Sequence, residues 1–300
     1  MSTVGRVSAV GTVGPGDLVA IVAPSGPVDP DALAAGVDVL RSWQWRVTVL
    51  PHVLDRRGYL AGADAERAAD FTAAWTDPKV RAVLCARGGY GAQRMVDLVD
   101  WTAIRAAEPK PLVGASDITA LHDVIRQRLG IGTYFGPMPA SAAFRDPVTA
   151  ECLRRTLTEG PQPLAAPEGI ALVGGGATGT LVGGTLTLLA SGLGTPTASP
   201  AAAGAIAFLE DVNEVPYRLD RCLTQLLRAG WFAGVRGVVL GSFAGCGPDE
   251  AVRALMTERL GPLDVPILWG LPAGHGRPQL TLPLGARVRL DADAGTLEPA

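Results

Sequence analysis

The first half of the chain alternates short apolar runs with longer stretches whose apolar residues recur at helical spacing. The apolar runs predict strands at residues 18–22, 46–50, 80–86 and 111–115. The amphipathic stretches predict helices at residues 29–45, 64–75, 92–99 and 117–129, with Asp64 as the N-cap of the second. Strands that alternate with helices in this way predict βαβ units and a mainly parallel sheet.

The second half is richer in β-structure and follows a connection built around a helix at 148–157. It predicts strands at 170–173, 206–209, 235–240 and 267–271, helices at 218–229 and 249–260, and a terminal hairpin beginning at 280–290. We therefore predict an α/β protein with an N-terminal domain over residues 1–150, a linker over 151–170 and a C-terminal domain over 171–300.

Composition narrows the possible classes of function. The 26 Lys and Arg against 29 Asp and Glu give a net charge of −3 with no basic run, which argues against nucleic acid as a partner. No charged residue lies between Glu168 and Glu210, but Gly and Pro interrupt this segment, so we read it as buried structure rather than a membrane span. The amino terminus lacks a signal-peptide pattern, and the prediction is a cytoplasmic protein.

The four cysteines form no C-x-x-C pair, which excludes a zinc ribbon and argues against a disulfide framework. With only three histidines, and none four residues from another, a His-based metal centre is also disfavoured. Gly174, Gly176 and Gly179 fit G-x-G-x-x-G, but the following residues look extended and no acid follows before Glu210. Dinucleotide binding is disfavoured for that reason, and we predict neither cofactor nor metal.

Ser116 is the best candidate nucleophile because it stands where a predicted buried strand runs directly into a helix. Gly114 permits a tight turn before it, and the amide of Asp117 lies in the first helical turn, where N–H groups can stabilise an anion. The motif G-x-S-x-G is incomplete because residue 118 is Ile118. A Ser in this position also serves as a helix N-cap, so that alternative stays open.

A glycine-rich loop is expected to lie at the same sheet edge. Arg87-Gly88-Gly89-Tyr90-Gly91 follows another predicted strand, and its Gly-Gly pair leaves backbone amides free to face an oxyanion. The alternative is a strand-to-helix turn that uses Gly for positive φ, which explains one glycine better than three.

For the base, His275 stands in a loop between two glycines, which favours function, whereas His122 within a helix is expected to be structural and His52 has no clear role. For the acid, Glu210 ends a predicted buried strand, where a carboxylate needs a partner such as an imidazole. Asp211 and Glu214 remain competitors that spacing alone does not exclude.

Taken together, these segments resemble the LD-carboxypeptidase family of serine peptidases, which includes muramoyltetrapeptide carboxypeptidase and the microcin C self-immunity protein. The similarity rests on the order and spacing of motifs along nearly the whole chain. They are VAPSGP (22–27), ARGGYGA (86–92), GASDITALH (114–122), FGPM (135–138), LVGGTLTLL (181–189), GTP (194–196), FLEDVNEVPYRLDRCLTQL (208–226), VVLGSF (238–243), LPAGHG (271–276) and LTLPLG (280–285).

The resemblance implies a triad of Ser116, Glu210 and His275 in a cleft between two α/β domains. Oxyanion donors would come from Gly88 or Gly89 and from Asp117. The implied activity is release of terminal D-alanine from a murein tetrapeptide during cytoplasmic cell-wall recycling, by a homodimer. A microcin C-type immunity hydrolase of peptidyl or aminoacyl nucleotide conjugates is the alternative within the family, and a non-catalytic peptide-binding protein is the alternative outside it.

Two residues depart from the family pattern, since Thr185 and Gln279 stand where Asn is common, and we expect these changes to affect substrate fit. A carboxypeptidase must also recognise a free carboxylate. Arg87 is the first candidate for that contact because it precedes the glycine pair, with a structural ion pair as the alternative role, and Arg94 and Arg277 are weaker candidates.

Overall fold

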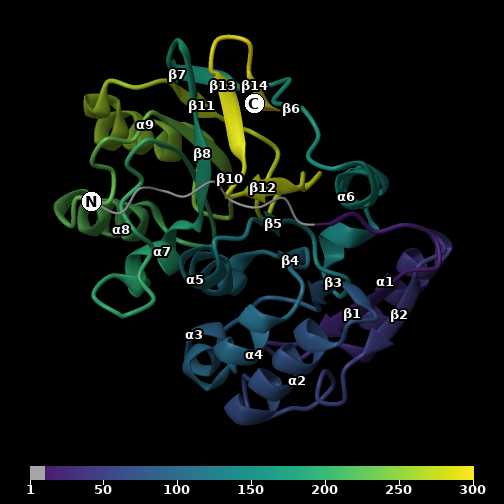
Figure 1. Cartoon of the computed structure of the whole chain (residues 1–300). Helices are drawn as coiled ribbons and strands as arrows, with labels where there is room; N and C mark the ends of the chain where they lie inside the picture. Colours follow the sequence, from purple (N-terminus) through teal and green to yellow (C-terminus); the bar gives the residue numbers. More distant parts are fainter. Residues whose placement is uncertain (1–10) are drawn as a thin grey trace.

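The computed structural model describes residues 11–300, and its first sheet is built mostly from the first half of the chain (Figure 1). The strands of this sheet are β1 (Leu18–Val22), β2 (Arg46–Val49), β3 (Val80–Cys85), β4 (Leu112–Gly114), β5 (Thr133–Phe135) and β12 (Leu282–Leu284). The helices of the same half are α1 (Pro30–Ser42), α2 (Asp64–Thr76), α3 (Ala92–Met95), α4 (Trp101–Ala106) and α5 (Thr119–Leu129), with 3-10 turns η1 (Val96–Leu98), η2 (Ser116–Ile118) and η3 (Ala142–Arg145).

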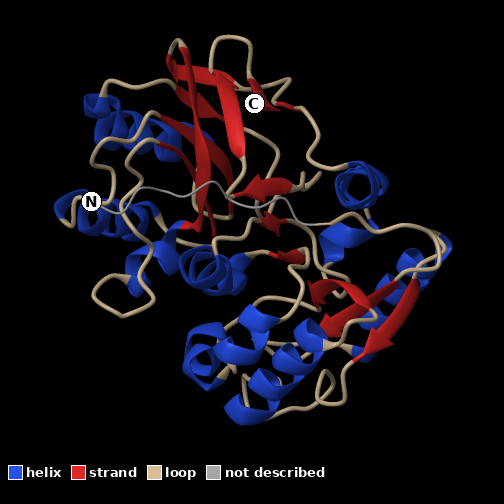
Figure 2. Ribbon diagram, in the orientation of Figure 1, coloured by secondary structure: helices blue, strands red, loops and turns tan. Residues whose placement is uncertain are grey.

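The second sheet comes from the rest of the chain, after the connecting helix α6 (Pro147–Glu159). Its strands are β6 (Leu164–Ala165), β7 (Ile170–Val173), β8 (Gly176–Thr185), β9 (Ala205–Val212), β10 (Gly237–Ala244), β11 (Ile267–Trp269), β13 (Arg287–Asp291) and β14 (Thr296–Pro299). The helices α7 (Leu186–Gly192), α8 (Pro216–Arg228) and α9 (Asp249–Leu260), followed by η4 (Gly261–Leu263), pack beside it (Figure 2).

Strand order confirms the predicted α/β class. Within residues 11–300 the first sheet runs β12-β5-β4-β3-β1-β2, and its pairs are parallel except for β12 with β5. The second sheet runs β6-β14-β13-β8-β9-β10-β11-β7 and is mixed. The carboxyl ends of β3 and β4 therefore meet at one edge, which is the usual position of a ligand site in such sheets.

The structure corrects two local predictions. Ala63, not Asp64, is the N-cap of α2, and its amide donates to the Glu66 side chain at 2.9 Å. The predicted terminal hairpin does not begin at residue 280, because the strand nearest that position, β12, is not part of the hairpin and pairs with β5 in the first sheet. The hairpin itself is β13 with β14.

The two sheets share part of one hydrophobic core. In Figure 1, β5 and β12, at one end of the first sheet, lie between the other strands of that sheet and the second sheet. Phe135 of β5 and Phe208 of β9 are both fully buried and meet edge to face, with ring centroids 5.2 Å apart. In the described part of the chain, no helix is both long and apolar enough to span a membrane.

Candidate active site

Ser116 lies in a strained turn at the carboxyl end of β4. Its φ is +62°, a conformation that is uncommon for a residue with a side chain and that concentrates at functional sites. Gly114 is required for the turn, because a Cβ there would lie 2.6 Å from the Ile118 side chain. The N-cap of η2 is Ala115, so the alternative in which Ser116 serves as the N-cap is wrong.

The glycine-rich loop after β3 packs directly against this turn, as the strand order requires. A Cβ on Gly88 would lie 2.8 Å from Cβ of Ser116 and 3.2 Å from its Oγ. Gly89 and Gly91 have φ of +118° and +127°. All three glycines are therefore needed for the loop, one for close approach and two for backbone conformation.

The side chain of Asp117 joins three segments at this edge, a role that the sequence did not suggest. Its Oδ2 accepts from Oγ of Ser25 at 2.6 Å and from the amide of Ala92, the first residue of α3, at 2.8 Å. Burial raises the pKa of the Asp117 carboxyl, and these two hydrogen bonds together with the charge of Arg67 oppose that rise. The feature of the sequence that could have indicated this contact is Ser25, whose hydroxyl lies in the turn after β1, at the same sheet edge.

The acid candidate, on strand β9, and the base candidate, in the loop after β11, meet beside the second sheet. Glu210 is fully buried on β9, and its Oε2 lies 2.7 Å from Nδ1 of His275 and accepts from the His275 amide at 3.1 Å. The competing acids have other partners: Asp211 accepts from Thr187, and Glu214 lies 3.6 Å from Arg218. Geometry thus selects Glu210 as the partner of His275.

This pairing sets both the protonation and the tautomer of the imidazole. Burial lowers the pKa of His275, but the hydrogen bond and the negative charge of Glu210 outweigh it, so the pKa is raised above 6.5. A carboxylate at Nδ1 keeps the proton on that nitrogen and leaves Nε2 free to act as a base.

The other two histidines have structural surroundings. His122 is buried, its Nε2 lies 3.0 Å from the Gly114 carbonyl, and burial lowers its pKa to about 4, which confirms the structural role expected for it. His52 contacts Asp70 at 2.9 Å. One ligand atom each from His52, Asp55 and Glu66 lie within 4.8 Å of one another, but Asp70 already engages the ring and Glu66 holds the start of α2.

The three arginines considered for binding the substrate carboxylate have different partners in the structure. Arg87 donates through Nη1 to the Pro27 carbonyl at 2.9 Å and takes part in no ion pair within residues 11–300, so the ion-pair alternative is wrong. Arg94 is paired with Asp64 at 2.8 Å. Arg277 is exposed and lines a cavity of about 270 Å³ beside the His275 loop.

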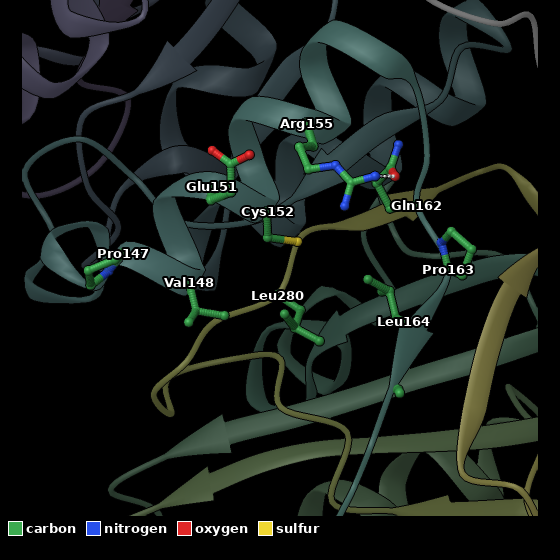
Figure 3. Close-up of a pocket in the computed structure, with 10 residues that line it drawn as sticks. Pro147, Val148, Glu151, Cys152, Arg155, Gln162, Pro163, Leu164 and Leu280 are labelled. Carbon is green, nitrogen blue, oxygen red and sulfur yellow. Dashed lines mark hydrogen bonds between the residues drawn. The ribbon is translucent and has the colours of Figure 1, made fainter.

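Another cavity, of about 640 Å³, lies between α6 and the segments around Leu164 and Leu280 (Figure 3). Apolar side chains and Cys152 face it, while Arg155 at its rim donates to Gln162 at 2.7 Å. It includes none of the three triad candidates, so we do not assign it to the reaction.

Two further predictions concern motifs elsewhere in the chain. Gly176 begins strand β8, which confirms that the residues after these glycines are extended and do not form the helix that dinucleotide binding requires. Of the two departures from the family pattern, Gln279 is buried, and its backbone amide donates to Oγ1 of Thr149. The hydroxyl of Thr185 donates to Oε1 of Glu210. Thr185 is therefore in direct contact with the acid candidate.

Comparison with known proteins places this chain in a family. The model of the LD-carboxypeptidase N-terminal domain matches residues 19–136, and that of the LD-carboxypeptidase C-terminal domain matches residues 178–290. A Streptomyces coelicolor protein named as a carboxypeptidase is 54% identical to this chain over 295 residues. The match covers 94% of this chain and 93% of the Streptomyces protein.

Solved structures agree with this assignment. Muramoyltetrapeptide carboxypeptidase from Oxalobacter formigenes superposes with a TM-score of 0.82 at 31% identity, covering 93% of this chain and 97% of that one. MccF in complex with glutamyl sulfamoyl guanosine shares the fold, with a TM-score of 0.89 at 22% identity and coverage of 97% and 98%. The chain belongs to the LD-carboxypeptidase family of peptidases.

Proposed function

We propose that this protein is a serine carboxypeptidase that hydrolyses an LD-peptide bond, with Ser116 as nucleophile, His275 as base and Glu210 as the acid that orients it. The observation that carries the proposal is the contact, 2.7 Å long, between the buried Glu210 on β9 and His275 in the loop after β11, together with the strained Ser116 turn at the end of β4. No step of this chemistry requires a metal or a cofactor.

In the proposed mechanism, Nε2 of His275 accepts the Ser116 proton as Oγ attacks the scissile carbonyl. The amides of Gly88 or Gly89 and of Asp117 stabilise the oxyanion, and His275 then protonates the leaving amine. Water attacks the acyl-enzyme by the same steps in reverse. Glu210 stabilises the imidazolium that forms at each transfer.

The proposed substrate is the murein tetrapeptide L-Ala-D-Glu-diamino-acid-D-Ala, which loses its terminal D-alanine in cytoplasmic cell-wall recycling, with the enzyme acting as a homodimer. The name of the Oxalobacter relative supports this choice. The alternative substrate is an aminoacyl nucleotide conjugate of the kind bound to MccF. Between residues 181 and 210 the only aromatic residue is Phe208, and it is fully buried, so this segment offers no ring to stack on a base.

A side-by-side assay of murein tetrapeptide and a sulfamoyl-adenylate conjugate tests the proposal. We expect faster release from the tetrapeptide and a loss of roughly 10⁶-fold in Ser116→Ala. Faster turnover of the conjugate would favour the immunity hydrolase. Binding of the tetrapeptide without any cleavage by the wild-type protein would favour a peptide-binding protein, and near wild-type activity of Ser116→Ala would reject the nucleophile.

Recognition of the terminal carboxylate is assigned to Arg87, whose remaining guanidinium donors are not used by the Pro27 contact. We expect Arg87→Met to raise KM for the free-acid peptide by roughly 10- to 150-fold, the range for a hydrogen bond to a charged group. Hydrolysis of a C-terminally amidated peptide should not change. Arg94→Met is the matched control, and equal losses on acid and amide would show that Arg87 only supports its loop.

A further inference from the structure

The two oxygens of the Glu210 carboxylate have different partners. Oε2 accepts from the amide and the ring of His275, at 3.1 and 2.7 Å, while Oε1 accepts from Oγ1 of Thr185. Glu210 is fully buried, so neither oxygen has access to bulk water. Without the Thr185 hydroxyl, Oε1 would be left as an unpaired buried acceptor, which is strongly unfavourable for an ionised group.

Thr185 occupies a position where its hydroxyl would ordinarily serve a helix. It is the last residue of β8 and the N-cap of α7, yet it makes no capping hydrogen bond to that helix. In the parallel register between β8 and β9, Thr185 lies directly beside Glu210. The hydroxyl is therefore used for the carboxylate instead of the helix terminus.

The backbone of Thr185 reaches the other half of the site. Its amide donates to Oγ1 of Thr119 at 3.1 Å in a buried contact, and Thr119 is the first residue of α5, three residues after Ser116. The close approach depends on Gly184, where a Cβ would lie 2.6 Å from Oγ1 of Thr119. One residue thus contacts both the acid candidate on the second sheet and the helix that follows the nucleophile candidate on the first.

We propose that Thr185 is a positioning residue for the reaction: its hydroxyl fixes the rotation of the Glu210 carboxylate so that Oε2 faces His275, and its amide sets that assembly relative to Ser116. The inference rests on the proposed triad. It assigns the departure from Asn at this position to the catalytic assembly rather than to substrate fit.

The test compares Thr185→Val and Thr185→Ser in hydrolysis of murein tetrapeptide. Valine keeps the shape but removes the donor, so we expect kcat to fall roughly 10- to 150-fold with KM unchanged. Serine retains the hydroxyl and should restore most of kcat. A merely structural role would not produce this separation of kcat from KM or the rescue by serine.

Thr187→Val is the matched control, because Thr187 donates a partly buried hydrogen bond, 2.7 Å long, to the neighbouring carboxylate of Asp211. It should leave kcat near the wild-type value. An unchanged kcat in Thr185→Val, an equal fall in Thr187→Val, or a change confined to KM would overturn the inference. If the wild-type protein cleaves no tetrapeptide, the proposed function fails instead, which is a distinct result.

Should Thr185→Val fail to fold, Thr119→Val tests the same link from the other side. It removes the acceptor for the Thr185 amide but leaves the partner of Glu210 in place, so we expect a roughly 2- to 10-fold fall in kcat, again with KM unchanged. A wild-type kcat in this variant, measured on protein shown to be folded by circular dichroism, would reject the link between the two halves of the site.

Discussion

At the scale of single residues, the pair of Glu210 and His275 shows how a buried charge is accommodated. A carboxylate without access to water is tolerated only when its oxygens are hydrogen-bonded. Here the partners are the hydroxyl of Thr185 and the amide and ring of His275. The sequence could not choose between Glu210 and Asp211, because adjacent residues on a strand point to opposite faces. Only the tertiary structure determines which face His275 approaches.

The protonation of His275 gives a prediction with a definite sign. The imidazole must be neutral to accept the Ser116 proton, so kcat/KM should rise with pH through a pKa above 6.5. Glu210→Gln removes the negative charge of Glu210 and the charge-assisted hydrogen bond, which contribute most to raising this pKa, but leaves the burial that lowers it and the smaller effect of Asp211. We therefore expect the His275 pKa to fall and kcat to drop by roughly 10⁴-fold, as when the wrong tautomer forms.

Titration of the imidazole resonances by NMR checks this, since the chain contains only three histidines. His122 provides an internal reference, because it contacts the Gly114 carbonyl rather than Glu210. An unmoved His275 titration in Glu210→Gln would mean that the carboxylate does not control the base.

At the scale of elements, parallel strands explain why the site could be partly predicted. Strands β3 and β4 are adjacent, so the loops after them were expected to meet, and the approach of Gly88 to Ser116 confirms it. Other features depend on contacts between residues far apart in the chain, such as Ser25 with Asp117 and β12 with β5. Periodicity along the sequence carries no information on such pairs.

Asp117 provides the test at this scale. Asp117→Ala leaves the Ser25 hydroxyl and the Ala92 amide without their buried acceptor, and each unpaired buried donor costs about 1–3 kcal/mol. We expect a lower free energy of unfolding in denaturant and a fall in kcat as the glycine-rich loop loses its anchor. Asp117→Asn retains one acceptor oxygen and should lose less of both. Unchanged stability in Asp117→Ala would show that the two donors find other partners.

At the scale of the whole molecule, the proposed triad depends on how the two sheets are held together. Ser116 follows a strand of the first sheet, and Glu210 and His275 belong to segments of the second. The strand β12 returns from the end of the chain to the first sheet, and a single cluster of buried residues includes side chains from both sheets. We therefore expect one cooperative unfolding transition rather than two.

Phe208 tests whether this shared core also supports activity. It is fully buried against Phe135 of the first sheet and lies two residues before Glu210 on β9 of the second sheet. Phe208→Ala should lower stability by ~3–5 kcal/mol and also reduce kcat, because a shift of about 1 Å between reacting groups can cost 10²-fold in rate. Phe71→Ala is the control, since Phe71 is equally buried but lies on α2, which packs against β1 and β3 of the first sheet. It should lower stability to a similar extent, while kcat of the folded fraction stays near the wild-type value. Equal kcat in the two variants would show that the contact between Phe208 and Phe135 stabilises the fold without setting the geometry of the triad.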